Sequence, residues 1–133
     1  MKRRAKREIR VIVLFYAATY GEKNAVIHEL RVYRCMPGRL PDLNKRFENA
    51  TLKLWEKHGF RPVGFWTTLV GDSNQDLTYL LEWKDQGERE RVWAAFMSDP
   101  DWLKARAESE KNGPIVAQIT NSILAPTAFS KLR

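Results

Sequence analysis

The sequence predicts one α+β domain, spanning residues 25–133, whose strands and helices follow in the order β-α-β-β-α-β. Two observations carry this prediction. Four short segments rich in β-branched and aromatic residues alternate with stretches whose apolar residues recur every three or four positions. Clusters of glycine, proline and asparagine separate these segments. A chain of 133 residues with 44% hydrophobic residues can build one core but is short for two domains.

The first strand is expected at residues 26–33, where neighbouring side chains point to opposite faces of a sheet. The odd-numbered face carries Ile27, Glu29, Arg31 and Tyr33, and the even-numbered face carries His28, Leu30 and Val32. A turn at residues 36–38 ends this strand.

The first helix follows that turn, because apolar residues there are spaced 3, 4, 3 and 4 positions apart, as one helical face requires. These residues are Leu40, Leu43, Phe47, Ala50 and Leu54. Asp42 suits the first turn of the helix, and Gly59 suits the left-handed position just beyond its end.

A β-hairpin is expected next. Residues 62–70 have strand composition, residues 71–74 (Gly-Asp-Ser-Asn) have turn chemistry, and residues 77–83 return as a second strand.

The second helical region begins with a capping pattern of Asp85 and Glu88. One face of this helix would present Arg89, Val92, Trp93, Phe96 and Met97. Asp99 followed by Pro100 predicts the start of another short helix, which the Asn-Gly-Pro sequence at 112–114 would end. Residues 115–124 supply the last strand. Trp83, Trp93 and Trp102 are expected in the core.

This order predicts a ferredoxin-like fold, in which helices cover one face of a four-stranded antiparallel sheet. The other face would remain bare, although both faces carry large residues. We expect the odd-numbered face of the first strand, with Ile27 and Tyr33, to be the bare one, together with Phe65 or Trp66. A bare apolar face is rare in a monomer, so the sequence predicts a homodimer that pairs two sheets.

The net charge of +7 is concentrated at the N-terminus, where six Lys and Arg residues and one Glu within residues 1–10 give +5. The remaining residues carry only +2, so a nucleic-acid-binding face is not expected. Residues 1–24 form a basic extension that is not expected to be part of the domain. An export signal, an ordered extra element and an unstructured extension remain alternatives for it, and its eight-residue apolar stretch is too short to span a membrane. We expect a cytoplasmic protein.

Short motifs along the chain resemble the NIPSNAP family over roughly residues 26–130. They are Glu29-Leu30-Arg31-Val32-Tyr33, Pro37-Gly38, Gly64-Phe65-Trp66, Gly71 with Asn74, Leu81-Glu82-Trp83, Asp99-Pro100-Asp101-Trp102, and Ser122-Ile123-Leu124 with Pro126 and Phe129-Ser130. The family pattern usually has a histidine in the third strand, and this sequence has none there.

The resemblance implies a dimeric α+β barrel. It also implies partner binding, because animal members are mitochondrial proteins linked to vesicular transport and mitochondrial quality control. The wider barrel superfamily includes cofactor-free monooxygenases, isomerases and haem enzymes. A shared fold alone is a weak guide to which of these activities applies.

Five residues are candidate ligand-binding residues. His28 could act as a base in a cleft or be a hydrogen-bonded core histidine, which is the commoner case. Arg31 could clamp an acidic ligand or pair with Glu29 on the same strand face. Tyr33 and Trp66 could line an aromatic pocket, and Gln118 begins a polar row (Gln118, Thr120, Ser122) that could orient a ligand or meet solvent.

No metal or cofactor is expected, since His28, His58 and Cys35 lack ligand spacing and no phosphate-binding glycine loop is present. Cys35 is expected to be a small half-buried side chain.

Two functions remain open. The first is a dimeric binding or interaction module, for a small hydrophobic or acidic ligand. The second is a cofactor-independent enzyme with His28 as base, Arg31 as anchor and Trp66 as wall. Because His28 and Arg31 have opposite parity on one strand, a shared pocket is disfavoured, which favours the binding module. Membrane or RNA binding through the basic extension is a third, weaker idea.

Overall fold

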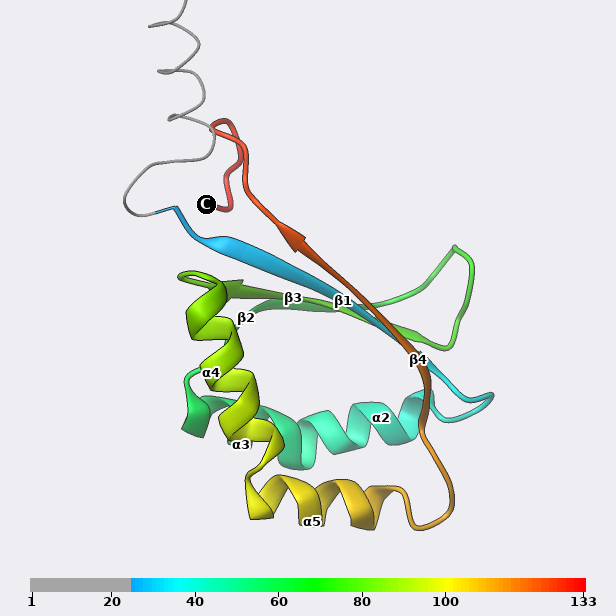
Figure 1. Ribbon diagram of the computed structural model, residues 1–133. Helices are drawn as coiled ribbons and strands as arrows, with labels where there is room; N and C mark the ends of the chain where they lie inside the picture. Colours follow the sequence, from blue (N-terminus) through cyan, green and yellow to red (C-terminus); the bar gives the residue numbers. More distant parts are fainter. Residues whose placement is uncertain (1–24) are drawn as a thin grey trace, which may run out of the picture.

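The computed structural model describes residues 25–133, which form a four-stranded antiparallel sheet with all helices on one side of it (Figure 1). The strands are β1 (Ile27–Cys35), β2 (Arg61–Thr67), β3 (Asp76–Trp83) and β4 (Val116–Leu124), arranged in the order β2-β3-β1-β4. The helical elements are α2 (Leu40–Arg46), η1 (Phe47–Thr51), α3 (Leu52–His58), α4 (Gln86–Met97) and α5 (Pro100–Ser109). The predicted α+β fold class is confirmed. The predicted extension, residues 1–24, lies outside the described residues.

The first helical region runs without a break through α2, η1 and α3, but η1 is a π-helical segment. A π-helical turn holds one residue more than an α-helical turn, so the buried face moves along the chain by one position. Thr51 and Trp55 are buried where regular spacing had predicted Ala50 and Leu54, which are only half-buried. The buried face is therefore shifted by one position because of the π-helical segment, although Leu54 still packs against the core from a half-buried position.

The predicted helix ends are confirmed. Gly59 has a φ of 83° at the end of α3, and the Asp85 carboxylate accepts a hydrogen bond of 2.8 Å from the Glu88 backbone amide at the start of α4. Asp99 caps α5 in the same way through the Asp101 amide. Its carboxylate also bonds His58 of α3, so a single residue ties the end of the first helical region to the start of α5.

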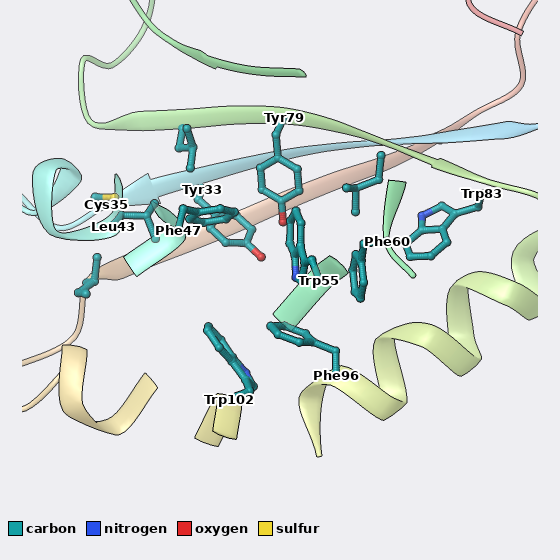
Figure 2. Close-up of a cluster of buried hydrophobic side chains, with 13 residues drawn as sticks. Tyr33, Cys35, Leu43, Phe47, Trp55, Phe60, Tyr79, Trp83, Phe96 and Trp102 are labelled. Atoms are coloured by element: carbon teal, nitrogen blue, oxygen red, sulfur yellow. The ribbon is translucent and has the colours of Figure 1, made fainter. Parts of the chain in front are cut away.

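The helices cover the odd-numbered face of β1, not the even-numbered face as predicted. Tyr33 is buried and pairs with Leu77 of β3, whose odd-numbered side chains also lie in the core. Figure 2 shows the rings of Tyr33 and Tyr79 close to Phe47 and Trp55 of the helical layer. The prediction that Tyr33 lies on the bare face was wrong. Trp66, which pairs with Thr78, does point to the open side.

The β2–β3 hairpin differs from the prediction mainly in length. Strand β2 ends at Thr67, three residues before the predicted end at Val70. Leu69 and Val70 are 98% exposed in the connecting loop, so their strand-like composition is not matched by a pairing strand. In the described part of the chain, no helix has the length and apolar character needed to cross a membrane.

Candidate functional site

A cavity of about 490 Å³ lies between the sheet and the helical layer. Strands β1 and β4 form one wall, and η1, α4 and α5 contribute side chains to the others. The cavity exists because the helices cover β1 and β3 more fully than the edge strand β4, where Ile119 is 49% exposed. Its volume lies within the range typical of sites for small organic molecules.

Most of the cavity surface is aromatic or apolar. The lining aromatic residues are Tyr33, Phe47, Trp55, Trp93, Phe96 and Trp102. Figure 2 shows Phe96 and Trp102 below the group formed by Tyr33, Phe47 and Trp55. Phe96 and Trp102 are in direct contact, with ring centroids 4.6 Å apart. Such a surface suits a flat ligand, because rings gain most of their contact area by stacking or by edge-to-face packing.

One buried carboxylate organises the wall formed by β1. Glu29 is fully buried, and each of its oxygens accepts hydrogen bonds from several donors. The donors, at 2.9–3.1 Å, are Arg31, Trp83, Arg89, Trp93 and Asn121. Burial alone would raise the pKa of Glu29, but these hydrogen bonds lower it to about 2. Glu29 is therefore ionised and neutralises one of the two arginines beside it.

Arg31 lines the cavity, and Glu29 fixes its position. Its guanidinium also donates to the hydroxyl of Tyr79 at 2.9 Å and to that of Tyr33 at 3.2 Å, and it lies 4.5 Å from the ring centre of Trp93. Burial would lower the pKa of Arg31, but these neighbours raise it above its ordinary value. The predicted Glu29–Arg31 pairing is thus present, and it leaves Arg31 a rigid, charged part of the wall.

A second arginine approaches the cavity from the helical layer. Arg46, at the end of α2, is 8% exposed and donates to Ser109 and Glu110, both at 3.3 Å. Its guanidinium lies 5.3 Å from the ring centre of Trp102. Burial lowers the pKa of Arg46, and Glu110 offsets this only in part. Arg106 also lines the cavity, 3.7 Å from Glu110.

The structure separates the predicted ligand-binding residues into two groups. Arg31, Tyr33 and Gln118 line the cavity. His28 and Trp66 belong to the opposite face of the sheet, so the pocket expected to hold Tyr33 with Trp66 is not formed. The enzyme hypothesis had placed His28, Arg31 and Trp66 in one site, and the structure does not bring them together.

Several lining residues were missed by sequence analysis, among them Arg46, Thr51 and Trp55. From the sequence alone, Arg46 is indistinguishable from a solvent-exposed charged residue on a helix. Thr51 and Trp55 do not follow the regular helical spacing. The one sequence signal for the shifted buried face was a tryptophan one position away from the predicted apolar stripe.

Other reactive groups contribute little chemistry. Cys35 is fully buried, whereas a half-buried position was predicted, and burial raises the pKa of its thiol, which disfavours the nucleophilic thiolate. Among residues 25–133, no three His, Cys, Asp or Glu side chains gather in a way that could hold a metal ion.

Comparison with known proteins finds a matching family model and several similar solved structures. The NIPSNAP family model matches residues 28–131. A NIPSNAP family protein of unknown function from Agrobacterium tumefaciens has a similar structure, with a TM-score of 0.74 and 22% identity over 84% of this chain and 97% of that one. An uncharacterised NIPSNAP-like domain protein from Burkholderia xenovorans gives a TM-score of 0.72 and 23% identity over 80% of this chain and 90% of that one.

No curated protein matches the chain. The two structural likenesses, at these identities, support the fold alone. The family model covers most of the chain, and its range includes every strand except the first residue of β1. The chain therefore belongs to the NIPSNAP family.

Proposed function

We propose that this protein is a small-molecule binding module whose cavity accepts flat, largely apolar ligands of up to two fused rings. The observation that carries the proposal is the half-open cavity of about 490 Å³ between aromatic walls. The lining residues include no histidine, cysteine or aspartate, and Glu110 is already engaged by Arg46. A free general base is thus lacking at the wall, which favours binding over the alternative, a cofactor-independent enzyme acting on a small planar or acidic substrate.

Blocking the cavity tests this proposal. Ile119→Trp places a large side chain at the cavity wall, whereas Ile123→Trp makes the same change four residues later on β4, outside the lining. We expect 2-naphthoate or the neutral 2-acetylnaphthalene to bind the wild-type protein, and Ile119→Trp to weaken this binding at least about tenfold. The Ile123→Trp variant should bind like wild type. Isothermal titration calorimetry measures all three, and absence of binding by both compounds, or equal effects of the two variants, contradicts the proposal.

We propose further that a second copy of the chain covers the open face of the sheet. This face holds Leu30, Val32 and Leu80, all only partly buried, together with Trp66 and Leu124, which are 53% and 43% exposed. A methyl group at Gly64 would lie 2.8 Å from the Trp66 ring, so the indole lies against the backbone of its own strand and presents a flat apolar surface. Exposed apolar surface of this kind is typical of an interface.

The expected mass of the wild-type protein by light scattering is twice the 15.5 kDa of one chain. Trp66→Glu should shift the protein to the monomer, because an unpaired charge would be buried between the sheets. Leu103→Glu is the matched control, since Leu103 is equally exposed but belongs to α5 in the helical layer. A wild-type monomer, or a dimer that survives Trp66→Glu, would rule out this interface.

A further inference from the structure

Hydrogen-bond donors without partners are concentrated at the cavity. Within residues 25–133, five buried side-chain atoms have no hydrogen-bond partner, and four of them belong to lining residues. The four are Arg46 Nε, Thr51 Oγ1, Trp55 Nε1 and Trp102 Nε1. Each of these atoms is itself closed to solvent, so together they show that this part of the wall has more hydrogen-bond donors than acceptors.

The chemistry of the four atoms is one-sided. The Arg46 Nε and the two indole nitrogens can only donate, and the Thr51 hydroxyl can donate as well. This part of the wall is therefore short of acceptors, and a ligand that brings acceptors suits it better than one that brings donors. Oxygen atoms that carry negative charge are the strongest such acceptors.

The charges around the cavity favour the same kind of ligand. Three arginines (Arg31, Arg46 and Arg106) line the cavity against one carboxylate, Glu110. Glu29 lies behind the wall and neutralises Arg31, but Glu110 must serve both Arg46 and Arg106, at 3.3 and 3.7 Å. One positive charge is left without a counterpart in the helical part of the lining.

Three of the four donors are placed by the first helical region and its π-helical segment. Arg46 and Thr51 are one π-helical turn apart, and Trp55 follows Thr51 by one α-helical turn, so all three lie on the buried face. The fourth donor, Trp102 of α5, packs against the Arg46 guanidinium. Regular α-helical spacing would have presented Ala50 and Leu54 on this face instead of Thr51 and Trp55.

We propose that the ligand of this cavity is an aromatic carboxylic acid, with its carboxylate held by Arg46 and its rings between the aromatic walls. This inference rests on the proposed function and adds the chemical class of the ligand. The carboxylate would complete the pairing that Glu110 begins.

Matched ligands and variants test the carboxylate site. We expect 2-naphthoate to bind at least tenfold more tightly than 2-acetylnaphthalene, which has nearly the same shape but no charge. Arg46→Gln should weaken the binding of 2-naphthoate by about 10- to 100-fold, as expected for loss of a charge-assisted hydrogen bond. Binding of 2-acetylnaphthalene should stay within about twofold. Arg91→Gln removes the same charge from an exposed position on α4 outside the lining, and should leave both affinities unchanged.

A second variant keeps the test decisive if Arg46→Gln does not fold. Glu110→Gln removes the carboxylate that competes for Arg46, so 2-naphthoate should bind severalfold more tightly while 2-acetylnaphthalene is unaffected. A residue with a merely structural role would not produce a gain for the acid alone. Equal affinity for the two compounds, or no gain in Glu110→Gln, overturns the carboxylate site. If neither compound binds, or binding resists Ile119→Trp, the proposed function itself fails.

Discussion

Glu29→Gln is expected to lower the free energy of unfolding by about 3–5 kcal/mol, the range found when one partner of a buried ion pair is removed. The carboxylate accepts hydrogen bonds from five side chains and lies between Arg31 and Arg89. Glutamine keeps the shape but offers one acceptor oxygen, and its amide group would face other donors. Arg31 and Arg89, both partly buried, would then lose the carboxylate that they share. Urea unfolding followed by circular dichroism measures the loss.

Glu82→Gln provides the control on the opposite face of the sheet. Glu82 is partly exposed and lies 3.7 Å from Arg61, so its removal should cost less than about 1 kcal/mol. If Glu29→Gln also costs less than 1 kcal/mol, the hydrogen-bonded cluster does not stabilise the fold as we infer.

The same group predicts how stability depends on pH. The pKa of Glu29 is lowered from 4.5 to about 2 in the folded protein, so its ionised form stabilises the fold above pH 4.5. This contribution, about 3 kcal/mol, is lost as the pH falls from 4.5 to 2. Because Glu29→Gln lacks the titrating group, the difference between wild type and variant should shrink over this range. A constant difference from pH 7 to pH 2 would contradict the assigned pKa.

The elements of this fold could be predicted because their ends carry local signals. Gly59, Asp85 and Asp99 each act within a few residues of their position in the chain, and all three were placed correctly. The choice of sheet face is a different problem. Strand β1 has apolar residues on both faces, so alternation defines two faces but not which of them the helices cover.

Long-range contacts decide that choice. Glu29 on the odd-numbered face meets Arg89 and Trp93 of α4 and Asn121 of β4, all at least 60 positions away in the sequence. No local sequence pattern predicts this cluster of hydrogen bonds around Glu29. The cavity has the same origin, because Arg31 and Tyr33 could be named as candidates on β1, whereas Arg46 and Trp102 meet only once the helices are packed.

Trp55→Ala is expected to cost about 3–5 kcal/mol, the range for removing a large aromatic side chain from a core. Trp55 is almost completely buried and packs against rings from five other elements or loops. Its ring centroid lies 4.7 Å from that of Phe60 and 5.4 Å from that of Tyr79. Neighbouring Leu54, which regular helical spacing places in the core, is only half-buried. Leu54→Ala should therefore cost less, roughly 1–2 kcal/mol.

The comparison of these two variants tests the π-helical segment itself. In a regular α-helix Leu54 would continue the apolar stripe of Leu40, Leu43 and Phe47. Leu54→Ala would then lower the free energy of unfolding more than Trp55→Ala does. With the extra residue in η1, the stripe passes instead through Thr51 and Trp55. A larger loss for Leu54→Ala than for Trp55→Ala in urea unfolding would mean that the helix is regular in solution. The side chains at positions 51 and 55 would then turn away from the cavity, and the lining would no longer be the one on which the proposed ligand depends.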